Sequence, residues 1–164
     1  MKESKRGSIR VLFVCLGNIC RSPLAQGVME HQLKRAGLED QVFVDSAGTA
    51  AYHVEEMPDS RAIEAAARRG IRIDGQRARQ VNGDDFSAFD YICAMDADNL
   101  ITLRSRCPTD EEARLHLLMD FAPGPGGQEV PDPYYGGEVG FEHALDLIDS
   151  AVEGLIQEIR SGLK

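Results

Sequence analysis

The stretch that most constrains this chain is VLFVCLGNICRSPLAQ, residues 11–26, in which an apolar run ends at a cysteine. Four apolar residues before Cys15 indicate a buried strand, and Ser22-Pro23 marks the start of a helix, so residues 15–21 must turn between the two. Turns that lead from a strand into a helix often hold phosphate, because the first amide groups of the helix point at the ligand. This turn is therefore the first candidate for a functional site.

The length of 164 residues suits one domain spanning residues 1–164, with residues 1–8 expected as a flexible N-terminal extension. No window approaches the ~18 consecutive apolar residues that a membrane span needs. The start MKESKRGS also lacks an apolar signal segment. We therefore expect a cytoplasmic protein with no membrane partner.

The charge balance limits the kinds of partner. Eighteen Lys and Arg against 27 Asp and Glu give a net charge of −9, which disfavours binding to nucleic acid or an anionic membrane surface. An anionic ligand would therefore need a local attraction. The chain has four cysteines, and Cys15 and Cys20 have no matching Cys or His pair at zinc-ligand spacing. We expect no metal site and no cofactor.

The spacing of apolar residues predicts strands over 9–14, 42–46, 89–95 and 114–119 and helices over 23–36, 58–70 and 139–160. This alternation predicts an α/β, single-domain three-layer fold with a four-stranded parallel sheet flanked by helices and a phosphate-binding loop after the first strand. Such sheets bind ligands at the carboxyl ends of their strands. Residues 122–137, rich in Gly and Pro, follow the fourth strand and form a loop long enough to suggest function.

The loop CLGNICR has the residues that an oxyanion requires. Gly17 and Asn18 allow unusual backbone angles, so that successive N–H groups can point inward, and the following helix adds its positive end. Arg21 adds a planar fork for two phosphate oxygens. The same field favours the thiolate of Cys15 over the thiol, so that Cys15 is expected to be a nucleophile that attacks phosphorus.

Two further residues have alternative interpretations. Ser22 would either cap the helix or stabilise the departing thiolate. Asp132, in the segment PDPYY, is braced by a proline on each side, and the adjacent aromatic rings would partly desolvate it, which suits a proton donor to the leaving oxygen. The alternative is that Asp-Pro is simply a turn.

These motifs together resemble the low-molecular-weight protein tyrosine phosphatases. The resemblance rests on VCLGNICRSP and PDPYY and on DSAGT, PDSRAIEAAARRGI, RARQ and AMDADN, which match in order along nearly the whole chain. It implies hydrolysis of phosphotyrosine and small aryl phosphates through a phosphocysteine intermediate, without a metal. Cys15 would be the nucleophile, Arg21 would bind the phosphoryl group, and Asp132 would act first as general acid and then as general base.

The resemblance also assigns supporting roles. The phosphate-binding residues would be Leu16, Gly17, Asn18, Ile19, Cys20, Arg21 and Ser22, the loop would be braced by Asn18 and Ser46, and the substrate entrance would be lined by Tyr52, Tyr134 and Tyr135. One of the three tyrosines could instead be an ordinary surface aromatic. The substrate would be a phosphotyrosine protein, linked to a tyrosine kinase or its targets, and the protein would be a monomer.

Three positions bear on specificity and regulation. Many relatives have a histidine where this chain has Gln76, and the resemblance leaves open whether Gln76 donates to Asp96 in its place. Ile19 stands where the family's arginine phosphatases have threonine, so it favours aryl phosphate. Cys20 resembles the family's redox partner, which captures oxidised Cys15 in a reversible disulfide, although a packed small residue is the alternative.

Three other functions compete with this interpretation. A thiol-coupled arsenate reductase would need two further cysteines in a relay, for which Cys93 and Cys107 are poorly placed. A phosphotyrosine-binding module without turnover would not need Cys15 and Asp132 together. A flavodoxin-like or receiver-like domain would leave the cysteine loop without a purpose.

Overall fold

The computed structural model describes residues 8–163, so that all but one residue of the predicted N-terminal extension lies outside the described part. Its centre is a four-stranded parallel sheet in the order β2-β1-β3-β4. The strands are β1 (Ile9–Cys15), β2 (Val42–Gly48), β3 (Tyr91–Ala94) and β4 (Leu115–Leu117). The predicted fold class and its four parallel strands are confirmed.

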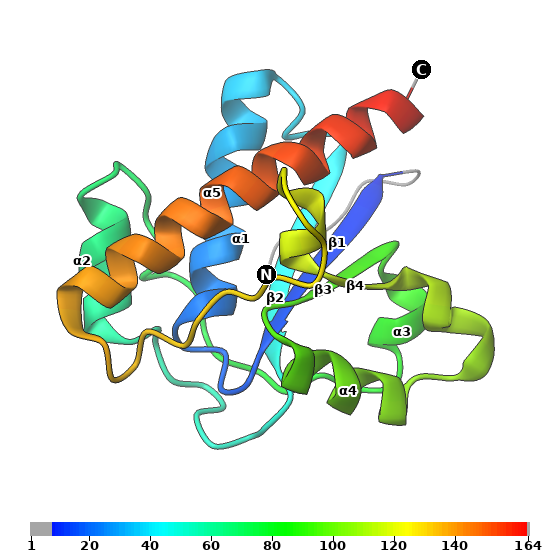
Figure 1. Cartoon of the computed structure of the whole chain (residues 1–164), viewed down its shortest axis with the longest axis horizontal. Helices are drawn as coiled ribbons and strands as arrows, with labels where there is room; N and C mark the ends of the chain where they lie inside the picture. Colours follow the sequence, from blue (N-terminus) through cyan, green and yellow to red (C-terminus); the bar gives the residue numbers. More distant parts are fainter. Residues whose placement is uncertain (1–7, 164) are drawn as a thin grey trace.

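Helices cover both faces of this sheet. They are α1 (Arg21–Ala36), α2 (Ser60–Ala67), α3 (Asp85–Ala88), α4 (Ala97–Arg106) and α5 (Gly137–Gly162), and 3-10 turns η1 (Thr109–Arg114) and η2 (Leu118–Phe121) flank β4. Figure 1 shows α1, α2 and α5 on one side and α3 and α4 on the other. The sequence predicted α1, α2 and α5 within a few residues at most ends, but it missed α3, α4 and the two 3-10 turns.

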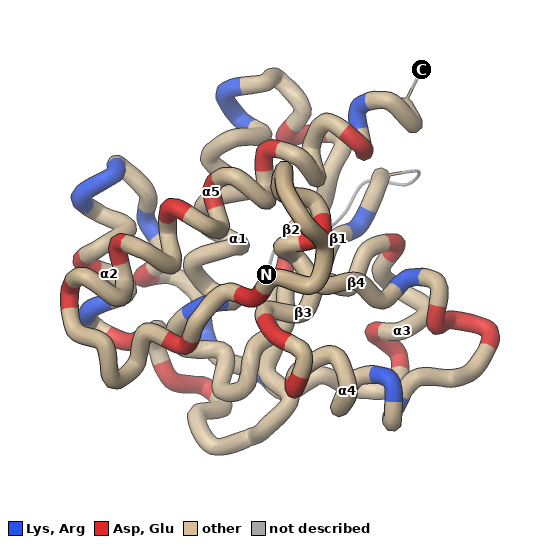
Figure 2. Tube along the Cα trace, viewed as in Figure 1, with Lys and Arg blue, Asp and Glu red and all other residues tan. Residues whose placement is uncertain are grey.

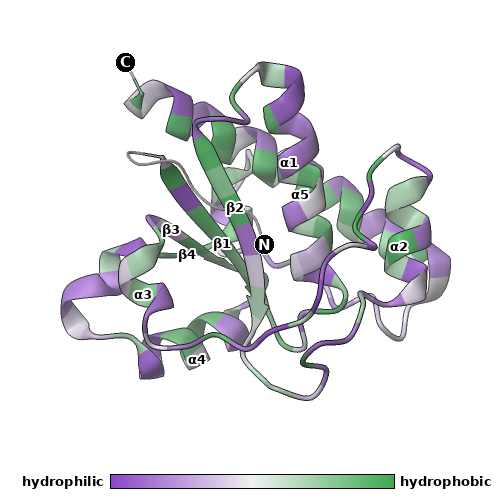
Figure 3. Cartoon of the chain, turned by 180° about the vertical axis from the view of Figure 1, so that it is seen from behind, coloured by the Kyte–Doolittle hydropathy of each residue, from purple (hydrophilic) through white to green (hydrophobic). Residues whose placement is uncertain are grey.

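The central strand β1 shows why the sheet needs cover on both faces. Val11 and Phe13 face the core formed with α1 and α5, whereas Leu12 and Val14 face the core formed with α3 and α4. All four are fully buried. Figure 3 shows the apolar strands enclosed between helices whose outer faces are hydrophilic. A continuous apolar run is what a parallel strand buried on both faces requires.

The carboxyl ends of the strands meet at one edge of the sheet. Cys15 ends β1 beside Gly48, which ends β2, and Asp96 follows β3.

Figure 2 shows Lys and Arg distributed over separate elements and interspersed with acidic residues. Within residues 8–163, no helix has both the length and the apolar character to cross a membrane.

Candidate active site

The loop from Cys15 to α1 forms the floor of the site. Asn18 adopts a left-handed backbone with φ of 58°, as its type allows, whereas Gly17 does not. A Cβ on Gly17 would lie 3.0 Å from Cδ2 of His53, so a side chain there would press against that ring. Helix α1 begins at Arg21, two residues earlier than the sequence predicted, so its positive end points at the loop.

Asn18 holds the loop in place through its side chain. Its Nδ2 donates to Ser22 Oγ at 2.8 Å and to Ser46 Oγ at 3.0 Å, and its Oδ1 accepts from the backbone N–H of Arg79 at 2.9 Å. Ser46 in turn donates to Gln26 Oε1 at 2.7 Å. Both Asn18 and Ser46 are buried, so this network joins the loop to β2 away from water.

Cys15 and Ser22 face each other inside the loop. The Cys15 Sγ and Ser22 Oγ atoms are 3.0 Å apart, and both residues are buried. Ser22 lies inside α1, whose N-cap is Cys20 and has no side-chain cap bond. The interpretation of Ser22 as the helix cap is therefore wrong, and its hydroxyl instead sits beside the sulfur.

Arg21 is held by two partners. Its Nη1 lies 2.7 Å from Asp96 Oδ2 and donates to the Val130 carbonyl oxygen at 2.9 Å, while the residue is only 3% exposed. Asp96 also caps α4 by accepting from the Asn99 N–H at 2.8 Å. The α4 cap thus fixes Asp96, and Asp96 fixes the guanidinium.

Gln76 does not reach Asp96. Its Nε2 donates to the Pro23 carbonyl oxygen at 3.1 Å, and its Oε1 lies 3.5 Å from Ser46 Oγ, whose hydrogen is donated to Gln26. The suggested bond between Gln76 and Asp96 is therefore wrong, because Gln76 lies beside α1 and β2 while Asp96 pairs with Arg21 at the end of β3. Gln76 therefore holds the first turn of α1 through the Pro23 carbonyl oxygen.

Asp132 comes to the same site from the segment between η2 and α5. Its Oδ2 lies 3.9 Å from Arg21 Nη2, and its Oδ1 accepts from the Tyr134 N–H at 3.0 Å. The side chain is 47% exposed. The predicted desolvation by the neighbouring rings is thus small in this structure, and the Asx turn with Tyr134 is what orients the carboxylate.

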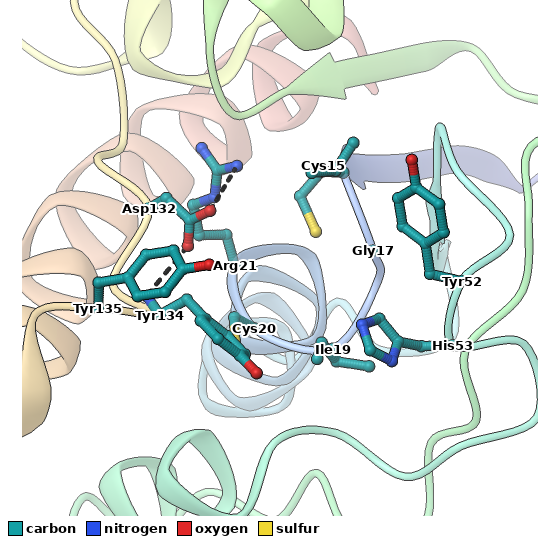
Figure 4. A pocket seen from close by; sticks show the side chains of 11 residues that line it. Cys15, Gly17, Ile19, Cys20, Arg21, Tyr52, His53, Asp132, Tyr134 and Tyr135 are labelled. Atoms are coloured by element: carbon teal, nitrogen blue, oxygen red, sulfur yellow. Dashed lines mark hydrogen bonds and ion pairs between the residues drawn. The ribbon is translucent and has the colours of Figure 1, made fainter.

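Cys15, Arg21 and Asp132 line a cavity of about 270 Å³, which is large enough to hold a phosphorylated ring. Figure 4 shows the Cys15 sulfur and the Asp132 carboxylate at this cavity, with Tyr134 and Tyr135 on one side and Tyr52 and His53 on the other. The rings of Tyr134 and Tyr135 meet edge to face at 5.0 Å. Tyr52 and Tyr135 are 76% and 92% exposed, so they stand at the rim.

His53 is a residue of this cavity that the sequence analysis missed. Its Nδ1 lies 3.2 Å from Glu56 Oε2, and its ring packs against Gly17. The available signal is its position directly after Tyr52, which the resemblance puts at the substrate entrance. The His53 ring, held by its contact with Glu56, therefore adds to the wall of the cavity beside Tyr52.

The remaining cysteines differ from Cys15 in their surroundings. Cys20 lines the cavity but is buried, and this burial raises the pKa of its thiol, with the nearby Asp59 adding to the effect. Burial likewise raises the pKa of Cys93, which lies in β3, and of Cys107 at the end of α4. All four cysteines are free. Cys93 and Cys107 are outside the cavity lining, so they do not form the relay that an arsenate reductase would need.

Comparison with known proteins agrees with this geometry. Residues 10–164 match the family model described as low molecular weight phosphotyrosine protein phosphatase. The low molecular weight phosphotyrosine protein phosphatase of Schizosaccharomyces pombe is 44% identical over 87% of this chain and 92% of its own.

Two solved structures extend the comparison. A protein tyrosine phosphatase from Entamoeba histolytica with Hepes in the active site superposes with a TM-score of 0.91 at 43% identity, covering 96% of this chain and 100% of that one. Vibrio vulnificus Wzb in complex with benzylphosphonate gives a TM-score of 0.80 at 28% identity, covering 93% and 99%. The family match, the level of identity and the shared fold together show that this chain belongs to the low molecular weight phosphotyrosine protein phosphatases, a family of enzymes.

Proposed function

We propose that this protein hydrolyses phosphotyrosine in proteins, and small aryl phosphates, through a phosphocysteine intermediate and without a metal. The observation that carries the proposal is the meeting of three groups at one cavity: the Cys15 sulfur with Ser22 Oγ at 3.0 Å, the buried Arg21 guanidinium, and the Asp132 carboxylate 3.9 Å from that guanidinium. They come from β1, α1 and the segment before α5.

In the first step, the Cys15 thiolate attacks phosphorus in line with the leaving oxygen. The S–P bond forms, the P–O bond to the ring breaks, and Asp132 gives its proton to the departing phenolate. Arg21 and the loop amides stabilise the charge on the phosphoryl oxygens, which is the larger contribution in such transfers. The hold of Asp96 on Arg21 keeps the guanidinium oriented before the substrate arrives.

In the second step, water attacks the phosphocysteine. Asp132, now a carboxylate, takes a proton from the water, the S–P bond breaks, and inorganic phosphate leaves. The sulfur departs as a thiolate, and Ser22 Oγ at 3.0 Å is close enough to donate a hydrogen bond to it. One carboxylate thus serves both steps, and the side-chain exposure of 47% gives it access to water.

The cavity favours an aryl ester. Tyrosine rings flank it on both sides, and Ile19 supplies an apolar side chain at its floor. Two relatives support this choice, since one was solved with Hepes, a sulfonate, in its active site and another with benzylphosphonate. A flat ring that stacks between aromatic side chains and a dianion in the loop together describe phosphotyrosine.

The proposal extends to the setting of the enzyme. A tyrosine kinase must make the ester, because that is the reaction class that transfers a phosphoryl group to tyrosine. We propose a cytoplasmic monomer, with a net charge of −9 that disfavours nucleic acid and membrane surfaces. Arg21 and the loop amides would stabilise the negative charge on the phosphoryl oxygens, which in metal-dependent phosphatases is done by a metal ion.

The first experiment is phosphate release from a phosphotyrosine peptide in the presence of a chelator, comparing the wild type with Cys15→Ser. Release that is abolished by the substitution supports the proposal. If neither protein releases phosphate but both bind the peptide, the chain is a binding module. Loss of release on adding the chelator would overturn metal independence.

A second experiment concerns the proton donor. Asp132→Asn is expected to lower kcat/KM by roughly 10²- to 10⁴-fold for esters with a basic leaving group, the usual size of a general-acid contribution. Esters with an acidic leaving group need no proton and should lose far less. An equal loss for both kinds of ester would contradict the assignment of Asp132.

A further inference from the structure

Arg61, in the first turn of α2, bridges two segments of the active site without lining the cavity. Its Nη1 donates to the Tyr134 carbonyl oxygen at 2.8 Å, which lies 73 residues further along the chain. Its guanidinium carbon also lies 5.0 Å from the centre of the Tyr134 ring and 5.1 Å from that of Phe141. Arg61 thus grips the backbone and the ring of a residue two positions after Asp132.

Asp59 holds Arg61 from the other side. Arg61 Nε and Nη2 donate to Asp59 Oδ1 and Oδ2 at 3.0 and 2.9 Å, so the pair is bidentate. Asp59 Oδ1 also accepts from the Arg61 N–H at 2.8 Å and caps α2. Such a fork leaves the guanidinium little freedom to rotate.

Asp59 is itself tied to the phosphate loop, because its backbone N–H donates to the Ile19 carbonyl oxygen at 2.8 Å. At the other end, the Tyr134 N–H donates to Asp132 Oδ1 at 3.0 Å. The bonds therefore run without a break from Ile19 through Asp59, Arg61 and Tyr134 to Asp132. This path links the loop that would hold the phosphoryl group to the carboxylate that would give the proton.

The segment that carries Asp132 is anchored before that residue by Val130, which is buried and bonded to Arg21 and Met95, so Arg61 supplies the anchor after it. Residues 122–136 contain Gly124, Gly126, Gly127 and Gly136 and form no strand or α-helix, and much of the segment is exposed. Proton transfer requires the carboxyl oxygen within about 2.6–3.2 Å of the leaving oxygen. A displacement of 1 Å can cost roughly 10²-fold in rate. Without Arg61, the chain after Asp132 would lose this anchor and the carboxylate could shift by such a distance, although Val130 would still hold the chain before it.

We propose that Arg61, clamped by Asp59, is a positioning residue that sets the distance between Asp132 and the phosphate loop. The inference rests on the proposed function, since it assumes that Asp132 donates the proton. Arg61 acts through the Tyr134 backbone and touches no reacting atom. Its removal should therefore impair the proton-dependent part of the reaction and leave thiolate attack and phosphate binding intact.

The test is Arg61→Ala, measured by kcat/KM on aryl phosphates with basic and with acidic leaving groups. We expect a loss of about 10- to 100-fold for basic leaving groups and of no more than about 3-fold for acidic ones. Arg61→Lys keeps a positively charged donor but not the planar fork, so its kcat/KM for basic leaving groups should lie between those of the wild type and Arg61→Ala. The matched control is Arg72→Ala, because Arg72 is an exposed arginine that also pairs with an aspartate two residues away, Asp74, outside the cavity.

The double variant Arg61→Ala with Asp132→Asn separates positioning from general loosening. If Arg61 acts through Asp132, adding Arg61→Ala to Asp132→Asn should change kcat/KM by less than about 2-fold. Equal losses for all leaving groups, or fully additive losses in the double variant, would overturn the inference. Failure of the proposed function would look different, since the wild type itself would then show no release that depends on Cys15.

Should Arg61→Ala prove too unstable to assay, Asp59→Asn gives the same test. Asparagine keeps the N-cap and the backbone bond to Ile19 but removes the ionic half of the clamp. We expect a smaller loss with the same dependence on the leaving group. An Asp59→Asn protein with wild-type values for every ester would count against the clamp.

Discussion

Replacing Gly48 with alanine would test how closely the end of β2 must approach the phosphate loop. A Cβ at this position would lie 2.7 Å from the Leu16 carbonyl oxygen and 3.1 Å from the carbonyl carbon of Gly17. Both are backbone atoms, so no side chain can swing away. Reaching an ordinary contact of 3.4 Å requires the loop to move by about 0.7 Å.

Two hydrogen bonds oppose that movement. The Thr49 N–H donates to the Cys15 carbonyl oxygen, and the Ala50 N–H donates to the Leu16 carbonyl oxygen, both at 2.9 Å. Forcing a methyl group into such a site costs about 1–3 kcal/mol of stability. Since a 1 Å misplacement costs roughly 10²-fold in rate, a shift of this size should lower kcat/KM by about 10- to 50-fold.

The assay pairs urea unfolding with kcat/KM for an aryl phosphate. Gly83→Ala is the control, because a Cβ on Gly83 has no atom within 4 Å and its φ is not positive, so it should behave as the wild type. If Gly48→Ala matched Gly83→Ala in both measurements, the close approach of β2 to the loop would not be needed for activity.

Three further predictions follow from single residues. Glu55 has a left-handed backbone with a φ of 75°, which costs a non-glycine residue about 1–2 kcal/mol. Glu55→Gly should remove this strain and lose only about 0.4–1 kcal/mol to the greater freedom of the unfolded chain, so the midpoint of urea unfolding should rise, and a midpoint that does not rise would contradict the prediction. Peroxide should oxidise Cys15 to a sulfenic acid that condenses with the Cys20 thiol and releases water, so that added thiol restores the wild type; equal recovery by Cys20→Ala would rule out this protection. The hydrogen bond from Arg61 holds the pKa of Asp59 below its ordinary value. The ionised carboxylate therefore stabilises the folded protein above about pH 4, and this stabilisation is lost as the pH falls through the pKa that Asp59 has in the folded protein. Urea unfolding at pH 3 and pH 6 should show that Asp59→Asn loses less stability on acidification than the wild type.

The parts of the site that could be predicted lie close together in the sequence. Cys15, Asn18, Arg21 and Ser22 fall within eight residues between a strand and a helix, and local geometry decides what a loop of that kind can bind. The flanking prolines of Asp132, and its place in a long loop that follows the end of the fourth strand, indicated that it belongs to this edge of the sheet. In the structure, Cys15, Arg21 and Asp132 line one cavity, and the buried Ser22 contacts the Cys15 sulfur from behind it.

The parts that could not be predicted depend on tertiary contacts. The bond between Arg21 and Asp96 joins residues 75 positions apart, and for Asp96 the sequence offered only a possible bond from Gln76. Helix α4 was missed because Leu100 and Leu103 are its only buried apolar residues, too few for a clear helical period. Arg61 gave no signal of its own, since an arginine early in a helix is usually exposed and solvated.

The charge of the chain sets one last condition on how the site works. A net charge of −9 opposes the approach of an acidic phosphoprotein, but this long-range field is weakened beyond about 8 Å at physiological salt. Arg21 is buried and is already paired with Asp96 at 2.7 Å, and buried charges are screened far less. Attraction for the phosphoryl group must therefore come from contact inside the cavity. There Asp96 orients the Arg21 guanidinium, but its negative charge also weakens the attraction of that guanidinium for the phosphoryl group. We therefore expect the positive end of α1, and the amides of the loop before it, to supply the rest of the attraction without a further charged side chain.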